Sequence, residues 1–313
     1  MRIGLVVNPV SGGGRGRKAG GIAWETLFGD GFDVRLIETS GPGEAARIGG
    51  ALACDGVDLV IALGGDGTVS EVVDGLMTAH AEGVALPEFG FVAAGTGMDF
   101  RRNFLLPDDP ARAVHSILAT AARPVDVGEA SFILPDGGAG RRYFLNVASL
   151  GVSGVIAAAV NAAKARGSRA GAALYYSHSI REILRYRAQA LSIQVDDGPV
   201  ITARIGVVAI ANGGWFGGGM HVAPDADPRD GAFEVVVMKS HSRWRTLWHL
   251  LQVSSGGHRN SPDIHFIRGR SVRIETPGDE QPGERVVLEM DGETMIGLPA
   301  SYRILPGALM LRA

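Results

Sequence analysis

The sequence Leu-Gly-Gly-Asp-Gly-Thr at residues 63–68 follows the apolar run Leu59–Ala62 and constrains the fold more than any other feature of the chain. A strand that ends in three glycines around one carboxylate exposes backbone N–H groups that a phosphate can approach, because no Cβ shields them. The apolar residues that follow have helical spacing: Val69, Val72, Val73 and Leu76. The segment therefore predicts a strand, a tight turn and a helix whose N-terminus faces the same phosphate. Asp66 would repel a phosphate unless it helps to hold a magnesium ion or to transfer a proton, so it favours chemistry over a plain turn.

The N-terminal third alternates strand and helix patterns, which is typical of a parallel sheet flanked by helices. The expected strands are Arg2–Val7, Phe32–Glu38, Asp58–Leu63 and Gly90–Ala94. The expected helices are Lys18–Phe28, Glu44–Ala53, Val69–Thr78 and Pro110–Ala121, the last capped by Asp108 or Asp109. Since 313 residues exceed what one hydrophobic core usually organises, we predict two domains, the first an α/β nucleotide-binding domain over residues 1–124.

Residues 125–313 change to β-rich segments separated by loops rich in Gly, Pro and Asp, which predicts a mostly antiparallel β-sandwich. The expected strands are Val125–Leu134, Arg142–Ala148, Ala190–Val195, Ile201–Asn212, Ala232–Met238, Ile264–Ile267, Ser271–Glu275, Val286–Asp291 and Ala300–Ile304. Two helical insertions are expected, at Val155–Arg187 and Arg243–Val253. A return of the extreme C-terminus to the first domain is an open alternative.

Composition excludes several classes of protein. A net charge of −3 and a pI near 6.2 speak against nucleic acid as the main partner. The single cysteine, Cys54, rules out an internal disulfide and a cysteine-rich metal cluster. The start of the chain lacks the pattern of a signal peptide, so we expect a cytoplasmic protein. The uncharged stretch Val147–Ala163 is short for a transmembrane segment and contains glycines, which favours a buried turn and helix.

Two further glycine turns follow predicted strands. Residues 8–16 read Asn-Pro-Val-Ser-Gly-Gly-Gly-Arg-Gly, and residues 95–103 read Gly-Thr-Gly-Met-Asp-Phe-Arg-Arg-Asn. The first of them is not a Walker A element, because no Gly-Lys-Ser/Thr follows. The carboxyl ends of parallel strands meet at one edge of a sheet, where open α/β sheets bind ligands. Three turns at that edge predict a nucleotide site.

The chain resembles the diacylglycerol kinase catalytic-domain family of lipid kinases, whose relatives include sphingosine kinases. The matching pieces keep the family's order from Asn8 to Glu293: Asn8-Pro9-x-Ser11-Gly12, Gly64-Gly65-Asp66-Gly67-Thr68, Gly95-Thr96-Gly97-x-Asp99-Phe100, Asn212-Gly213 with Phe216-Gly217-Gly218-Gly219, Pro224-x-Ala226 with Asp230-Gly231, and Asp291-Gly292-Glu293. Gly-Gly-Asp-Gly-Thr alone is shared with NAD kinases and phosphofructokinases. The complete series is far more specific.

The resemblance implies an ATP- and Mg²⁺-dependent lipid kinase with its nucleotide site in the cleft between the domains. The implied ATP-binding residues are Asn8, Ser11, Gly12, Gly13, Gly14, Thr39, Gly64, Gly65, Asp66, Gly67, Thr68, Val69, Ser70 and Thr96. It also implies a magnesium site with Asp230 as the side-chain ligand and backbone carbonyls near Asp227 and Ala232. A hard cation accepts such an all-oxygen set. Asp230-Gly231 by itself is equally typical of a hairpin turn.

Kinases of this type use the glutamate of Asp291-Gly292-Glu293 as the base that takes the proton of the substrate hydroxyl. The resemblance therefore implies that Glu293 is catalytic, with Asp291 beside it. Asp66 is the rival base, or it could hold magnesium through water, with Asp99 and Asp126 extending the network. A plain hairpin turn is the structural alternative for Asp291-Gly292.

Two residues depart from the family pattern: Ser70 and Met98 stand where asparagine is common. These departures keep open a nucleotide-sensing protein without turnover. An NAD kinase-like enzyme with a soluble substrate is the other alternative, because NAD kinases share Gly-Gly-Asp-Gly-Thr, although Asn8-Pro9-x-Ser11-Gly12 and Asp291-Gly292-Glu293 count against it.

Our primary expectation is transfer of a phosphoryl group to a diacylglycerol-like or sphingoid lipid that is presented at a membrane surface. We expect no transmembrane segment, and a homodimer is compatible with the sequence. In the segment Arg243–Val253, Trp244, Leu247, Trp248 and Leu251 recur at helical spacing beside two arginines. This pattern fits an interfacial helix at lipid headgroups or an amphipathic helix packed on the β domain.

Overall fold

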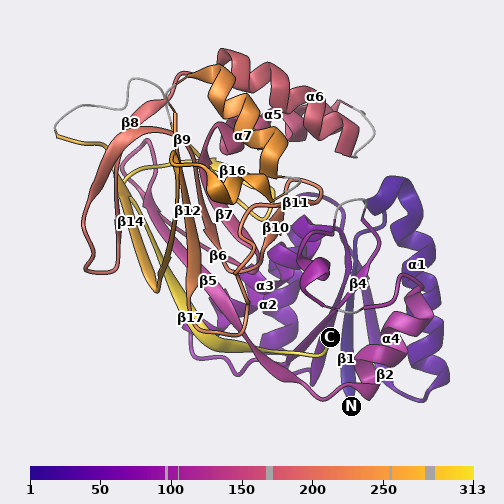
Figure 1. Cartoon of the computed structure of the whole chain (residues 1–313). Helices are drawn as coiled ribbons and strands as arrows, with labels where there is room; N and C mark the ends of the chain where they lie inside the picture. The colour runs from indigo at the N-terminus through magenta and orange to yellow at the C-terminus, as the bar shows by residue number, and fades with distance from the viewer. Residues whose placement is uncertain (96–97, 105, 167–171, 241, 254–255, 279–285) are drawn as a thin grey trace. The chain divides into compact units, whose positions relative to one another are not determined.

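The computed structural model describes residues 1–95, 98–104, 106–166, 172–240, 242–253, 256–278 and 286–313. Contacts divide the chain into two compact units (Figure 1). Unit 1 comprises Met1–Asp126 and Pro306–Ala313, and unit 2 comprises Val127–Leu305. Strands β5 (Arg123–Ile133) and β17 (Ala300–Leu311) each begin in one unit and end in the other.

Unit 1 is built on a parallel sheet in the order β4-β3-β1-β2. Its strands are β1 (Arg2–Val7), β2 (Asp33–Glu38), β3 (Leu59–Gly64) and β4 (Glu88–Ala93). The end of β17 adds a parallel neighbour to β4, with Leu311 opposite Phe89. All six residues of β3 are buried, as expected for a central strand that is covered on both faces.

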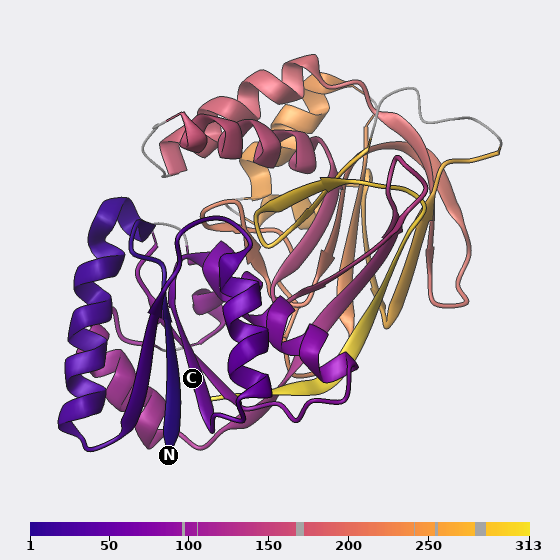
Figure 2. The same ribbon diagram turned by 180° about the vertical axis from the view of Figure 1, so that it is seen from behind.

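Two pairs of helices cover the two faces of this sheet. Their bounds are α1 (Ser11–Gly29), α2 (Glu44–Cys54), α3 (Asp66–Ala81) and α4 (Pro110–Ala119). The pair α1 and α4 lies on one face and the pair α2 and α3 on the other, as Figure 2 shows from behind. The Asp109 side chain caps α4 by accepting a hydrogen bond from the Arg112 N–H at 2.9 Å. A 3₁₀ turn, η1 (Phe100–Asn103), forms the end of the third glycine turn.

Unit 2 is mostly antiparallel β structure. One run of strands has the order β16-β15-β7-β9-β8-β14-β17; β12 pairs with β9 and β13, and β5 pairs with β6 and β17. The bounds are β6 (Ala139–Phe144), β7 (Val147–Gly151), β8 (Gln189–Val195), β9 (Ile201–Ala211), β10 (Trp215–Phe216), β11 (Met220–His221), β12 (Phe233–Lys239), β13 (Ile264–Gly269), β14 (Ser271–Glu275), β15 (Val287–Met290) and β16 (Glu293–Ile296). Its core contains the buried rings of Phe144, Phe233 and Tyr302.

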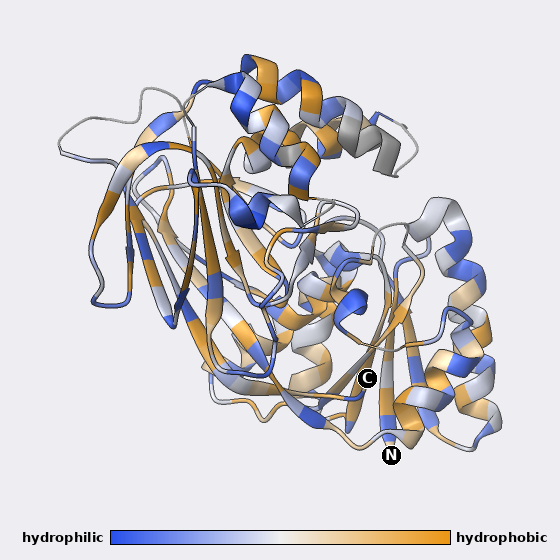
Figure 3. Ribbon diagram, in the orientation of Figure 1, coloured by the Kyte–Doolittle hydropathy of each residue, from blue (hydrophilic) through white to orange (hydrophobic). Residues whose placement is uncertain are grey.

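Helices α5 (Val152–Ala165), α6 (Ala172–Arg185) and α7 (Arg243–Val253) complete unit 2, followed by the 3₁₀ turn η2 (Gly257–Asn260). A small cluster of Val152, Ile156, Val160 and Ile183 joins α5 to α6. Figure 3 shows hydrophobic residues concentrated along the strands of each unit, with hydrophilic residues frequent on the helices. In the described ranges, no helix has the length and hydropathy needed to cross a bilayer.

The predicted fold classes are confirmed, an α/β unit followed by a mostly antiparallel β-sandwich. The ends of the elements differ in informative ways. The predicted strand Arg142–Ala148 is two strands, β6 and β7, that break at Leu145 and Asn146. Strand β16 was not predicted, and β17 runs seven residues beyond the predicted end at Ile304. Segment Val147–Ala163 forms β7 and most of α5, so the predicted helix is confirmed, whereas a buried strand stands where a turn was expected.

Candidate functional site

Three glycine turns meet at the carboxyl edge of the unit 1 sheet, after β1, β3 and β4. A Cβ added to Gly95 would lie 2.6 Å from the Gly65 Cα, and a Cβ added to Gly12 would lie 2.1 Å from the Ala94 carbonyl oxygen. Real Cβ atoms do not approach backbone this closely, so at Gly12 and Gly95 the backbones of neighbouring turns lie in direct contact. The sequence expectation that the three turns converge therefore holds within unit 1.

Asn8 ties the first turn to the second. Its Nδ2 donates to the Thr68 Oγ1 at 2.9 Å, and its Oδ1 accepts from the Val10 N–H at 3.2 Å. Its own backbone N–H donates to the Leu63 carbonyl at 2.9 Å, and its carbonyl accepts from the Ser11 hydroxyl at 2.9 Å. One asparagine thus fixes the ends of β1 and β3 and orients two hydroxyls at the same edge.

Residues Gly12, Gly13 and Gly14 have φ values of +59°, +73° and +94°. This left-handed run is why α1 begins with a turn and not with regular helix, and it favours glycine at all three positions. Apart from the adjacent residues and the nearby backbone of α1, no described residue has an atom within 4 Å of a Cβ built on Gly13 or Gly14. The run leaves backbone on the open side of the loop, as a phosphate-binding turn requires.

The remaining predicted ATP residues of unit 1 fall around this edge. The Thr39 N–H donates to the Val7 carbonyl at 2.8 Å, which places Thr39 at the end of β1. The Val69 side chain is buried and its N–H donates to the Gly65 carbonyl at 3.1 Å, so Val69 could contact a nucleotide only through other backbone atoms. Ser70 is also buried. Gly64 packs so closely on Thr68 that a Cβ would lie 2.5 Å from its Oγ1. Thr96 lies outside the described residues.

Asp66 is the first residue of α3, and its Oδ1 accepts from the Phe100 N–H at 3.1 Å. Burial raises the pKa of Asp66, and hydrogen bonds from backbone N–H groups, Phe100 first, oppose that rise. Met98, one of the two departures from the family pattern, is buried and has a left-handed φ of +47°. The described part of the third turn, from Met98 to Phe100, therefore lies against Asp66 and reduces its access to water.

A neutral residue in place of Asp66 should stabilise the fold at neutral pH. Because the folded-state pKa of Asp66 is raised, its contribution to stability is present below the unfolded-state pKa and is lost as pH rises through the folded-state pKa. We expect Asp66→Asn to raise the thermal midpoint at pH 7 and to match the parent chain at acid pH, where both side chains are neutral. Thermal unfolding at several pH values measures this difference.

Glu44 offers a control of opposite sign for that measurement. Hydrogen bonds from the hydroxyl and N–H of Ser40, together with Arg47, lower the pKa of Glu44 to about 2. Its contribution is therefore present above the unfolded-state pKa and lost as pH falls, so Glu44→Gln should lower the midpoint at pH 7. A midpoint of Asp66→Asn at or below that of the parent chain at pH 7 would contradict the assignment of a burial cost to Asp66.

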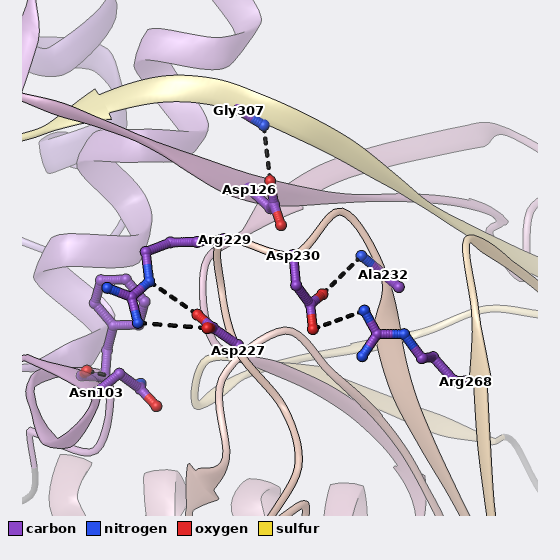
Figure 4. A network of polar contacts seen from close by, with 9 residues as sticks. Asn103, Asp126, Asp227, Arg229, Asp230, Ala232, Arg268 and Gly307 are labelled. Atoms are coloured by element: carbon purple, nitrogen blue, oxygen red, sulfur yellow. Dashed lines mark hydrogen bonds and ion pairs between the residues drawn. The ribbon is translucent and has the colours of Figure 1, made fainter.

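The two acidic residues that were expected to extend the network are both buried and engaged. The Asp126 Oδ1 accepts from the Gly307 N–H at 2.7 Å, which joins β5 to β17 within unit 1 (Figure 4). Asp99 pairs with Arg102, with 3.3 Å between the Asp99 Oδ1 and the Arg102 Nε. These contacts give both carboxylates a structural role, and their part in a metal network stays a prediction.

The predicted metal loop lies in unit 2, before β12. The Asp230 Oδ1 accepts from the Ala232 N–H at 3.1 Å, while its Oδ2 lies 2.8 Å from an Arg268 nitrogen (Figure 4). Asp227 pairs with Arg229 at 2.9 Å, and its carbonyl accepts from the Asp230 N–H at 3.3 Å. Asp230-Gly231 is therefore a turn at the start of β12 and not the hairpin that the sequence offered as an alternative, because β12 pairs with β9 and β13 and not with the preceding strand β11.

The Asp230 carboxylate and the neighbouring carbonyls could bind a hard cation only if the ion replaced Arg268 as the partner of Asp230. Arg268 also lies opposite Glu234 across β12 and β13, and burial raises the pKa of Glu234. One guanidinium thus sits between two carboxylates, which is the charge balance that a divalent ion would otherwise supply. The described ranges contain no group of three Asp, Glu, His or Cys side chains arranged to hold a metal.

Asp291 and Gly292 form a two-residue hairpin between β15 and β16, with Met290 opposite Glu293. Their φ values of +50° and +94° match the type I′ turn that suits such hairpins. The Asp291 carboxylate accepts three backbone N–H groups, from Leu145 at 2.8 Å, Asn146 at 3.0 Å and Val147 at 2.9 Å. The break between β6 and β7 lies at these three residues, because their N–H groups point toward the Asp291 carboxylate.

Two residues that the sequence analysis missed also hold this turn. The Glu289 Oε1 accepts from the Gly292 N–H at 2.5 Å, and its Oε2 accepts from the Ser149 hydroxyl at 2.5 Å. The Asn161 Nδ2 on α5 donates to the Gly292 carbonyl at 2.8 Å. The one sequence feature that could have pointed to Glu289 is its position as an acidic residue among the apolar residues of β15. Asn161 gives no signal, because its partner is a backbone carbonyl 131 residues away.

Glu293 is the first residue of β16 and is half-buried. Both residues of the turn before it are held by hydrogen bonds. The Asp291 carboxylate binds N–H groups where β6 meets β7. The Gly292 backbone binds the side chains of Glu289 and Asn161. Glu293 is therefore held at a defined position with its side chain accessible to a substrate. The glycine turns with Asp66 belong to unit 1, whereas Asp227, Asp230, Asp291 and Glu293 belong to unit 2. The predicted meeting of Asp66 and Glu293 around one triphosphate stays a prediction.

Comparison with protein families gives two matches that together span most of the chain. The diacylglycerol kinase catalytic domain matches residues 2–130, and the YegS C-terminal NAD kinase beta sandwich-like domain matches residues 146–313. A diacylglycerol kinase of Mycobacterium tuberculosis is 28% identical over 99% of this chain and 94% of its own length. A diacylglycerol kinase of Bacillus subtilis is 24% identical over 96% of this chain and 92% of its own length.

Solved structures show the same fold. The crystal structure of a diacylglycerol kinase from Bacillus anthracis str. Sterne has a TM-score of 0.72 at 24% identity, over 99% of this chain and 96% of that chain. The crystal structure of yeast NADH kinase complexed with NADH has a TM-score of 0.53 at 13% identity, over 99% of this chain and 82% of that chain. At these identities both likenesses speak for the fold alone.

Proposed function

This chain belongs to the diacylglycerol kinase catalytic-domain family of lipid kinases, and from that premise we propose that it transfers the γ-phosphoryl group of ATP to a hydroxyl of a diacylglycerol-like or sphingoid lipid. The reaction is an alcohol phosphorylation, which asks mainly for positioning and neutralisation of charge. Mg²⁺ would supply part of that neutralisation. We propose that the lipid is presented at a membrane surface on the cytoplasmic side.

One observation carries the proposal, the meeting of three glycine turns through backbone at one sheet edge. The turns put glycine backbone, the Thr68 hydroxyl and the Asp66 carboxylate within one small region of unit 1. Backbone N–H groups and the N-terminus of α3 suit the phosphates. Asp66 suits a magnesium-bound phosphate better than a free one, because a bare carboxylate would repel it.

Glu293 is the base of the proposed reaction. An alcohol is a weak nucleophile until its proton has an acceptor within hydrogen-bond reach, and a half-buried carboxylate on a fixed turn provides one. In the proposed step the Glu293 carboxylate takes the hydroxyl proton as the lipid oxygen bonds to the γ-phosphorus and ADP leaves. Asp230 with neighbouring carbonyls would hold a magnesium ion once Arg268 has moved aside.

A phosphoryl-transfer assay over a panel of acceptors tests the proposed function. The purified chain is incubated with γ-labelled ATP, Mg²⁺ and, in separate reactions, dispersed diacylglycerol, sphingosine or NAD. We expect label in a lipid product and none in NADP, with no label transferred when Mg²⁺ is chelated. Omission of the acceptor is the control for simple ATP hydrolysis.

The same assay separates the two rivals. The yeast NADH kinase shares the fold, and label in the NAD reaction alone would replace the lipid kinase by an NAD kinase-like enzyme. Nucleotide binding without transfer to any acceptor would instead support a nucleotide-sensing protein.

A further inference from the structure

Helix α7 turns its largest apolar side chains away from the protein. Trp244, Trp248 and Leu251 are 65%, 59% and 57% exposed. Their spacing of four and then three residues puts them on one stripe of the helix, here called the α7 stripe. Single exposed apolar residues are normal, but two tryptophans and a leucine in one exposed row indicate a contact surface.

The opposite side of α7 is occupied and partly polar. Thr246 and His249 are buried, and the His249 Nε2 lies 2.9 Å from the Ser261 hydroxyl. Val253 joins a hydrophobic cluster with Val236 and Met238, and Leu247 packs on the cluster between α5 and α6. The helix is therefore anchored by its inner side, so the α7 stripe is not needed for packing within unit 2.

The charges beside the α7 stripe are cationic. Arg243 and Arg245 flank Trp244, and α7 contains no acidic residue. The Arg243 guanidinium donates to the Leu184 carbonyl at 3.5 Å, and Arg245 forms an ion pair with Asp263. Both arginines remain exposed enough to meet an anionic surface, with Arg245 53% exposed.

We propose that the α7 stripe docks the protein on a bilayer that contains anionic lipids, with α7 lying in the plane of the headgroups. Tryptophan has a large apolar ring with one polar N–H, which suits the boundary between headgroups and acyl chains, and flanking arginines suit lipid phosphates. Anionic lipids attract such basic flanks electrostatically. A second copy docked through the same stripe would bring like-charged arginines together, which disfavours self-association. The proposal does not depend on the kinase reaction, because docking needs neither nucleotide nor substrate.

Vesicle flotation of the full chain without nucleotide tests this surface. The probes are vesicles of phosphatidylcholine and vesicles of phosphatidylcholine with phosphatidylglycerol. We expect the chain to float with the anionic vesicles and less with the neutral ones, and high salt to weaken the difference. The double variant Trp244→Ser with Trp248→Ser should bind the anionic vesicles more weakly by on the order of tenfold or more, because two apolar side chains lose their burial.

Phe28→Ser is the matched control, since Phe28 on α1 is an aromatic side chain that is 61% exposed outside α7. It should bind vesicles like the parent chain. Substitutions at exposed positions cost little stability, so equal thermal midpoints would show that the double variant is folded.

The proposal is overturned if the parent chain does not float with anionic vesicles, or if the double variant floats equally well. Light scattering, which measures the oligomeric state, tests the alternative that a second copy of the chain binds the α7 stripe. A parent dimer that the double variant abolishes, without vesicle binding, would assign the stripe to a second copy. Because flotation reports no turnover, its failure is distinguishable from failure of the proposed reaction.

Discussion

Glu293→Gln should lower kcat by about 10²–10⁴-fold, the range that a positioned general base usually contributes. Glutamine keeps the size and hydrogen-bonding character of the side chain but has no basic oxygen to receive the hydroxyl proton. The KM for ATP should change little, because the predicted nucleotide residues belong to unit 1. Steady-state kinetics with the lipid acceptor found in the acceptor panel measures both constants.

Glu275→Gln is the control for Glu293→Gln, since Glu275 is an exposed glutamate at the end of β14 in the same unit. It should leave kcat within a factor of about two, as expected of a surface substitution away from any special contact. Retention of most of kcat by Glu293→Gln, with loss of activity in Asp66→Asn, would transfer the role of base to Asp66. An equal loss of kcat in both variants would fit Glu293 as the base and Asp66 as a carboxylate that helps to hold magnesium in the same reaction.

The α/β half of the fold was predictable because its signals are local. Apolar runs such as Leu59–Leu63 indicate buried strands, and Pro110 after Asp109 marks the start of a helix. The ends of helices and strands were less predictable where the backbone conformation of glycine decides them. Nothing in the residue types of Gly12, Gly13 and Gly14 specifies that all three take left-handed φ values, yet this run determines where regular helix begins in α1.

The contacts around Glu293 were less predictable, because they depend on partners far apart in the sequence. No Gly or Pro marks the break between β6 and β7, which forms where three N–H groups turn to the Asp291 carboxylate from about 145 residues away. The sequence offered a hairpin and a catalytic turn as alternatives for Asp291-Gly292. The structure shows a type I′ hairpin, and that hairpin is also what positions Glu293.

Helix α7 shows a third limit of sequence patterns. Helical spacing of Trp244, Trp248 and Leu251 predicts a common stripe but does not say whether the stripe faces protein or solvent. The buried inner side of α7 includes Thr246 and His249. Their side chains form hydrogen bonds with serines outside the helix, at positions 240, 242 and 261, which the pattern cannot locate. The structure shows α7 packed on unit 2 by its inner side, as the amphipathic alternative expects, with the α7 stripe exposed. Contact of that stripe with lipid stays a proposal.

Asp291→Ala should destabilise the chain by about 3 kcal/mol or more and should also impair catalysis. Three backbone N–H groups lose their acceptor at a buried site, and an unsatisfied buried donor costs about 1–3 kcal/mol. Alanine is also strained at the left-handed φ of +50°, which asparagine tolerates well. Urea unfolding measures the loss of stability, and kcat measures the displacement of Glu293.

Asp291→Asn is the graded control, because its amide keeps one acceptor oxygen and the type I′ turn while losing the second oxygen. We expect its stability and kcat to lie between those of the parent chain and Asp291→Ala. This ranking of the variants distinguishes a positioning role from a direct part in the chemistry. If Asp291 only holds the turn, kcat should fall in step with the loss of stability. If Asp291→Asn unfolds at the same urea concentration as the parent chain but has no activity, Asp291 acts on the substrate itself, and the positioning role assigned to its three hydrogen bonds is insufficient.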